Sequence, residues 1–286
     1  MFAIIGIVTV VASVVGGYML NGGHMGVLWQ PFEFLIILGA ALGSMLLGNP
    51  TTVLKGVVSN FGQIFKGSRH NKESYLELLT MLYTIFKLAK SKGDLALESH
   101  VEKPEESTIF QKFPKFMHDH HTVAFLCDYL RLLTLGTNNA HEVEAIIDAE
   151  IETHHNELHS YSGAVNTMAD AMPALGIVAA VLGVIHTMGS ITEPPEVLGH
   201  LIGGALVGTF FGVLVSYGFC APFAKNLEQT FNTETQYLNC IKVALLAHMQ
   251  GYAPAVSVEF ARKILTHDVR PTFLEAESRI TNAPPD

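Results

Sequence analysis

Charged residues are scarce in this 286-residue chain and are unevenly placed. Only 15% of the residues are Asp, Glu, Lys or Arg, whereas about 25% is usual for a soluble globular domain. Lys and Arg are absent from residues 1–54 and 132–224, and all seventeen lie in 55–131 and 225–279. Hydrophobic residues make up 49% of the chain. The composition therefore disfavours a soluble domain and indicates apolar segments that alternate with two charged regions.

Cysteine, basic charge and catalytic motifs are also lacking. The three cysteines are far apart and lack metal-ligand or redox-motif spacing, so we interpret them as reduced and structural. The formal net charge is −9, and phosphate binding needs a basic footprint, which argues against a nucleic acid partner. The sequence contains no nucleophile–base pair, phosphate loop or metal motif, so we expect neither an enzyme nor a cofactor or metal site.

Four apolar segments are long enough, or nearly so, to cross a membrane. A hydrocarbon core of roughly 30 Å needs about 20 apolar residues in a helix. The predicted spans are Phe2–Leu20, Phe32–Gly48, Met172–Ile191 and Val197–Cys220. The first could instead be a signal peptide, but it lacks a basic start and a small-x-small cleavage site. We therefore interpret it as a retained helix and expect an all-α, polytopic membrane protein.

The basic residues predict the topology of these spans. The linkers Asn21–Gln30 and Thr192–Glu196 hold no Lys or Arg, whereas the long middle segment and the tail hold all of them. By the positive-inside rule, these two charged regions and both termini are cytoplasmic. The apolar spacing of the middle segment is helical, and it shows no strand alternation. The predicted domains are spans one and two (1–48), a cytoplasmic helical domain (49–171), spans three and four (172–222) and a cytoplasmic helical tail (223–286).

Small residues recur every four positions within three of the spans. The rows are Gly204, Gly208 and Gly212 in span four, Gly39 and Gly43 in span two, and Ala179 and Gly183 in span three. Rows of this kind let helices approach closely in lipid. They predict tight helix packing and favour association of several copies.

Acidic residues are missing from the middle of every span. Glu33 lies near one end of span two, and His186 and His200 lie toward the outer ends of spans three and four. Ionisable groups inside a membrane are costly and usually functional. If this protein helps to move a proton, a second protein must therefore supply the central carboxylate. The alternative is that the spans are an anchor and no ion moves.

Several ordered motifs resemble one known family. Residues 173–186 read PALGIVAAVLGVIH, residues 208–212 read GTFFG, and residues 217–222 read YGFCAP. Together with GYAP at 251–254, they make the chain similar over nearly its whole length to the MotA family of flagellar stator subunits, in the MotA/TolQ/ExbB proton-channel superfamily.

The resemblance implies a location, partners and a function. Members lie in the bacterial inner membrane, where several copies, expected to be five, surround a dimer of MotB. MotB contributes an intramembrane aspartate and grips peptidoglycan. The resulting proton channel converts ion flow into torque on the rotor protein FliG. The missing carboxylate of the spans agrees with this arrangement.

The resemblance also implies roles for residues near the cytoplasmic side. Lys90 and Glu98 match a charged pair that contacts the rotor, although solvated helix surface is the usual setting of such charges. The family often has Arg where this chain has Lys90. Lysine keeps the positive charge but cannot donate two parallel hydrogen bonds as a guanidinium does.

Pro173 and Pro222 match two prolines that couple ion binding to movement. The alternatives are a helix start with Asp170 as cap for Pro173, and a simple kink for Pro222.

Three residues match positions of the family's ion path. Ala180 and Thr209 are expected to line it, and Tyr217 matches near its cytoplasmic mouth, where an interfacial aromatic anchor is an equally good interpretation. Sodium-driven relatives tend to carry a hydroxyl where this chain has Ala180. A sodium ion needs several oxygen ligands, so the alanine favours protons as the transported ion.

A sodium-driven stator remains an alternative function, as does a TolQ- or ExbB-like energiser, although proteins of the latter kind have a three-span layout. A membrane scaffold is the remaining alternative.

Overall fold

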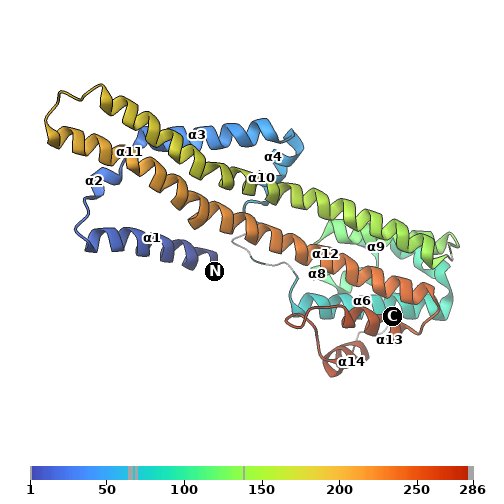
Figure 1. Ribbon diagram of the computed structural model, residues 1–286. Coiled ribbons are helices and arrows are strands. Elements are labelled where there is room, and N and C mark those ends of the chain that lie inside the picture. The colour runs from blue at the N-terminus through green and yellow to red at the C-terminus, as the bar shows by residue number, and fades with distance from the viewer. Residues whose placement is uncertain (1, 64–66, 68–69, 138, 283–286) are drawn as a thin grey trace. The chain divides into compact units, whose positions relative to one another are not determined.

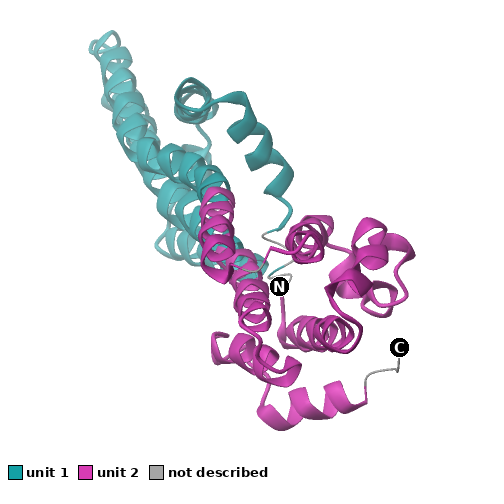
Figure 2. Ribbon diagram, turned by 90° about the vertical axis from the view of Figure 1, so that its right-hand side faces the viewer, with its two compact units in different colours: residues 1–67, 156–231 teal, residues 68–155, 232–286 magenta. Residues whose placement is uncertain are grey.

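The computed structural model describes residues 2–63, 67, 70–137 and 139–282, and within them it is built of helices alone. The chain divides into two compact units, shown in Figure 2. Unit 1 comprises Met1–Gly67 and Asn156–Phe231, and unit 2 comprises Ser68–His155 and Asn232–Asp286. This confirms the predicted all-α class.

Unit 1 contains the apolar helices (Figure 1). Its elements are α1 (Phe2–Leu20), α2 (Met25–Leu28), α3 (Pro31–Gly48), α4 (Thr51–Asn60), the second part of α10 (Ala140–Met188), α11 (Pro195–Val215), the π-helical turn η4 (Ser216–Cys220) and the first part of α12 (Ala221–Met249). Among the described residues, four helical stretches are long and apolar enough to cross a membrane, which confirms the number of predicted spans.

The third and fourth predicted spans are parts of much longer helices. At about 1.5 Å per residue, the 49 residues of α10 extend roughly 73 Å, more than twice a hydrocarbon core, so only part of the helix can lie in lipid. A drop in hydropathy does not end a helix, because backbone hydrogen bonds continue through polar residues. The predicted domain boundaries at 171/172 and 222/223 fall inside α10 and α12. These boundaries mark where the predicted spans meet the membrane surface. They do not coincide with the limits of the two compact units, and they stay predictions.

The span helices leave most of their apolar surface uncovered within this chain. None of the residues of α1 is buried, and Leu35 of α3 and Ile177 of α10 are also exposed. The helices meet at a small cluster of buried residues: Ile37, Ala41, Met172 and Ala179. Large exposed apolar surfaces need a covering, and helices of this length are long enough to take it from lipid.

Unit 2 is a helical domain around one core. Its elements are α6 (Lys72–Lys92), η1 (Asp94–Leu97), α7 (Glu98–Glu102), η2 (Pro104–Glu106), η3 (Phe110–Lys112), α8 (Pro114–Met117), α9 (His120–Thr134), the remaining parts of α10 and α12, α13 (Pro254–Lys263) and α14 (Phe273–Thr281). Leu82 and Phe86 of α6 pack there with Leu126 of α9 and Leu245 of α12, all fully buried. The helical spacing predicted for the middle segment is thereby confirmed for α6 and α9.

Polar caps define where the helices of unit 2 begin. Asn71 starts α6 with a capping box that it forms with Ser74, which satisfies N–H groups that lack a helical partner. Glu77 is buried in α6, and its Oε1 accepts the N–H groups of Lys115 (2.7 Å) and Phe116 (3.1 Å). A carboxylate at a helix start is favourable, so Glu77 fixes α8 against α6.

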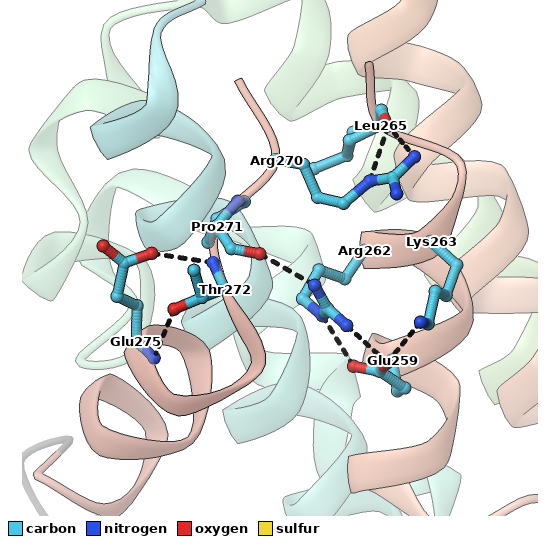
Figure 3. Close-up of polar contacts among 8 residues, drawn as sticks. All are labelled: Glu259, Arg262, Lys263, Leu265, Arg270, Pro271, Thr272 and Glu275. Carbon is cyan, nitrogen blue, oxygen red and sulfur yellow. Dashed lines mark hydrogen bonds and ion pairs between the residues drawn. The ribbon is translucent and has the colours of Figure 1, made fainter. Parts of the chain in front are cut away.

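Arg262 secures the segment between α13 and α14 (Figure 3). Its guanidinium is buried, donates to both carboxylate oxygens of Glu259 at 2.7 Å, and donates to the carbonyl of Pro271 at 2.8 Å. Arg270 donates to the carbonyl of Leu265 at 2.8 Å. Two guanidinium groups thus satisfy carbonyls of a loop that has no regular structure of its own.

Ion pairs then tie α14 to the start of α6. Lys72 pairs with Glu275, and Arg279 pairs with Glu73, each at 2.8 Å. The hydrogen bond from Lys72, followed by those from Thr272, lowers the pKa of Glu275 to about 2. Because this pKa is lowered, the contact is complete above the ordinary pKa of a glutamate and is lost as the pH falls toward 2.

We predict that Arg262→Met loosens α14 more than Lys263→Met does. The first change leaves the Pro271 carbonyl and the Glu259 carboxylate without their donor, at a cost of about 3 kcal/mol. Lys263 is exposed and lies 3.9 Å from Glu259, so its loss is expected to be within about 0.5 kcal/mol. Limited proteolysis of the detergent-solubilised protein measures the difference. Equal cleavage rates after residue 263 in both variants would contradict the role of Arg262.

Candidate functional site

In unit 1, glycines let the backbones of α10 and α11 approach closely. A Cβ on Gly212 would lie 2.6 Å from the carbonyl oxygen of Met172, and one on Gly176 would lie 2.9 Å from that of Gly208. A Cβ on Gly183 would lie 2.7 Å from Cβ of Ala205. Real Cβ atoms do not approach so closely, so the two backbones are nearly in contact. The small-residue rows predicted in spans three and four are confirmed as packing residues.

The row in span two behaves differently. A Cβ on Gly39 or Gly43 would meet nothing within 4 Å. The helix α3 packs in this chain through Ile37 and Ala41, which lie in the buried cluster. The prediction of a close contact at this row is therefore wrong within the single chain.

The predicted ion-path residues Thr209 and Ala180 lie at the glycine contact. The hydroxyl of Thr209 on α11 donates to the carbonyl of Gly176 on α10 at 3.4 Å. The backbone nitrogen of Ala180 is 3.4 Å from the position of a Cβ on Gly208, the residue before Thr209. Both side chains are half-buried. The fold thus brings the two residues to one contact between α10 and α11, and their role in an ion path stays a prediction.

Pro173 lies well inside α10 and does not begin a helix. The helix continues without interruption from Ala140 to Met188, so the alternative with Asp170 as an N-cap is wrong. Asp170 accepts a hydrogen bond from the side chain of Asn166 instead, at 3.1 Å. A proline here lacks the N–H that would bond the carbonyl of Ala169, which weakens the helix at this turn. Pro173 also follows Met172, whose carbonyl faces Gly212.

Pro222 directly follows a π-helical turn. Residues Ser216–Cys220 form this turn between α11 and α12, and Pro222 is the second residue of α12 and is exposed. Such turns widen a helix by one residue and are frequent at functional sites. The structure thus has a π turn directly before Pro222, at the place where a kink was considered. Gly218 precedes the proline by four residues. A glycine and a proline at this spacing do not by themselves predict a π turn.

Tyr217 opens onto a groove beside the π turn. The groove has a volume of about 430 Å³, and α1 forms its other wall with Phe2, Gly6 and Val10. Tyr217 is exposed, whereas its neighbour Ser216 is fully buried and its hydroxyl has no hydrogen-bond partner among the described residues. The π turn thus holds two polar side chains at the end of an apolar helix.

The charged residues predicted for rotor contact lie in unit 2. Lys90 is in the last turn of α6, is exposed, and donates to the carbonyl of Gly251 at 3.3 Å. Gly251 ends α12 with a φ of +88°, a conformation that favours glycine, so the ammonium lies at the negative end of that helix. Glu98 begins α7, is exposed, and has no ion pair among the described residues. The two side chains do not pair with each other.

A polar pocket of about 370 Å³ adjoins Lys90. Asp94, Thr137 and His248 line it with Lys90. The ring of His248 stacks on Phe86 with centroids 4.4 Å apart, and its Nε2 lies 3.9 Å from Asp94 Oδ1. Its Nδ1 is buried without a hydrogen-bond partner among the described residues. Sequence reasoning did not single out His248, because no spacing connects it with Asp94.

Comparison with protein families gives two matches along the chain. Residues 4–93 match the family described as motility protein A N-terminal. Residues 118–240 match the MotA/TolQ/ExbB proton channel family.

Curated relatives match over almost the full length. The chain is 40% identical to motility protein A of Salmonella typhimurium and 41% identical to that of Escherichia coli, in each case over 98% of this chain and 95% of the relative. It is 37% identical to chemotaxis protein LafT of Vibrio parahaemolyticus, over 96% of both chains.

Two solved structures share the fold. A chain of the flagellar MotAB stator complex from Bacillus subtilis aligns with a TM-score of 0.74 and 26% identity, covering 98% of both chains. A chain of C. jejuni MotAB aligns with a TM-score of 0.79 and 22% identity, covering 95% of this chain and 98% of that one.

We predict that Gly212→Ala disrupts unit 1, whereas Gly39→Ala does not disturb its internal packing. The added methyl at residue 212 meets a backbone carbonyl, which cannot turn aside as a side chain does, and overpacking of this kind costs about 1–3 kcal/mol. The methyl at residue 39 meets open space. Thermal aggregation of the detergent-solubilised chain measures both. Equal losses of thermal stability would show that the α10–α11 contact is not the tight one.

Proposed function

This chain belongs to the motility protein A family, within the MotA/TolQ/ExbB proton channel family, and on that premise we propose that it drives flagellar rotation. It acts as a stator subunit that forms a proton channel with MotB and converts proton flow into torque on the rotor protein FliG.

The absence of an acidic residue at the α10–α11 contact is the observation that carries the channel proposal. Thr209 and Ala180 lie there, and the described parts of the spans hold no Asp or Glu in their middle. Glu33 is in the first turn of α3, at the end of its span. A proton crossing the membrane needs a group that accepts and releases it. MotB supplies that group as an aspartate, and this chain supplies a dry, small-residue wall beside it.

The same contact supports protons over sodium. A sodium ion must replace its hydration shell with several oxygen ligands. Ala180 has no side-chain oxygen, and the hydroxyl of Thr209 already donates to Gly176. A proton needs only the partner's carboxylate. A sodium-driven stator remains the second candidate and would need ligands from other chains.

Two weak points in long helices support coupling of proton binding to movement. Pro173 interrupts the hydrogen-bond pattern of α10, and the π turn before Pro222 interrupts that of α11 and α12. Of these helices, α10 and α12 have residues in both unit 1 and unit 2. A bend at either point, set by the charge of the partner's aspartate, changes the direction in which the helix enters unit 2. Tyr217 in the π turn lines the cytoplasmic mouth of the path.

Uncovered apolar surface supports the assembly and the location. The exposed helix α1 and the open row of Gly39 and Gly43 leave room for close neighbours, in line with five copies around a MotB dimer in the inner membrane. Both termini then lie in the cytoplasm. A TolQ- or ExbB-like energiser is the weaker candidate, because the described part of the chain has four candidate spans and the chain matches motility protein A over 98% of its length.

Complementation tests the proposed function directly. We expect the chain, expressed with its MotB, to restore swimming to a bacterial strain that lacks stators. A protonophore should stop that swimming within minutes, and external sodium should not change its speed. A matched strain that expresses a MotB without its aspartate should remain non-motile. Speed that follows sodium and survives the protonophore would contradict the proton assignment, and no swimming at all would contradict the function.

Charge reversal tests the proposed rotor contact. We expect Lys90→Glu to lower swimming speed at least twofold, and the double variant with Glu98→Lys to lower it further, because exposed charges set register and encounter with a partner. Lys115→Glu is the control, since Lys115 is also an exposed lysine of unit 2. Normal swimming of the double variant, with assembly into the membrane unchanged, would exclude the contact.

A further inference from the structure

The outer face of α13 carries a row of exposed apolar residues. Tyr252, just before the helix, is followed at intervals of four by Val256, Phe260 and Ile264, and each side chain is between 38% and 43% exposed. We call these four residues the α13 stripe. The rings of Tyr252 and Phe260 lie 5.1 Å apart, so they form one surface. A spacing of four places the residues along one side of a helix.

Folding of unit 2 does not require the α13 stripe. The opposite face of α13 holds the helix in place, since Val258, Ala261 and Leu265 are buried in the core cluster. A helix at a domain surface normally shows polar residues on its outer face. The stripe is therefore surplus apolar surface in unit 2, and contiguous surface of this kind marks a docking site.

Basic residues stand at both ends of the α13 stripe. Lys90 donates to the carbonyl of Gly251, the residue directly before Tyr252. Lys263 is exposed beside Ile264, and Figure 3 shows it turned toward Glu259. Both oxygens of that glutamate already accept hydrogen bonds from Arg262, which offsets its charge. A lysine thus stands at each end of the stripe in a chain of net charge −9.

We propose that the α13 stripe is the apolar half of the rotor contact, and that it binds an amphipathic helix of FliG whose apolar face ends in acidic residues. The inference rests on the proposed function, because Lys90 joins the stripe to the predicted rotor charges. Anchors spaced over about three turns suit a helix laid along the row. Two copies that met symmetrically through this face would oppose lysine to lysine, so such a contact is a poor occupant. A membrane surface is the remaining alternative occupant, and the experiments below distinguish it from FliG.

Photo-crosslinking identifies the occupant. A photoreactive phenylalanine analogue at residue 260 in the full chain, expressed with MotB in swimming cells, should crosslink to FliG. The same analogue at Leu274 of α14, which is also exposed, should crosslink to FliG far less. Crosslinks from residue 260 to a second copy of this chain, or to lipid alone, would overturn the proposal.

Binding measurements separate the stripe from the rest of the motor. We expect Val256→Asp with Phe260→Asp to weaken binding of purified FliG to the detergent-solubilised complex with MotB at least tenfold. Both residues are exposed, so copurification with MotB should be unchanged, and Leu274→Asp is the control. Unchanged affinity in the double variant would overturn this inference alone. A wild-type chain that fails to restore swimming would overturn the proposed function as well.

Discussion

The near-contact of two backbones at Gly176, Gly208 and Gly212 is the constraint on which unit 1 depends. Only hydrogen fits between α10 and α11 at these positions, so the pairing of these two helices is set by the absence of side chains. The same contact brings Thr209 and Ala180 together and excludes a large polar group from between them. A path beside this wall must take its charged group from elsewhere, which is why the proposed mechanism needs a partner.

Tight and weak points alternate along α10 and along the helical stretch that α11, η4 and α12 form. The glycine contact holds α10 and α11 together, whereas Pro173 and the π turn before Pro222 lie at or close to its end and weaken the backbone there. In the proposed mechanism, a change of charge on the partner's aspartate beside the glycine contact produces bending at these weak points. In unit 2, Lys90 is anchored on Gly251, and Arg262 anchors the loop that leads to α14. These hydrogen bonds hold in place the surface that is proposed to contact the rotor.

Much of the fold could be predicted, and the errors have physical causes. Span number followed from apolar runs, and the close packing of Gly208 and Gly212 followed from their spacing. The row at Gly39 has the same spacing but faces open space, because spacing does not say which helix lies opposite. Pro173 resembled a helix start because an Asp precedes it, yet the helix continues through it. The α13 stripe escaped notice because α13 has apolar residues on its buried face as well.

By itself, the sequence determined that the chain has four apolar helices, where its charge gathers and that its spans lack a central carboxylate. These properties add up residue by residue, since transfer of each side chain between water and lipid is nearly independent of its neighbours. Only the tertiary structure decided which glycines touch, where the helix widens into a π turn, and which face of α13 remains exposed. Those properties depend on what lies across from each residue, and a one-dimensional pattern does not contain that information.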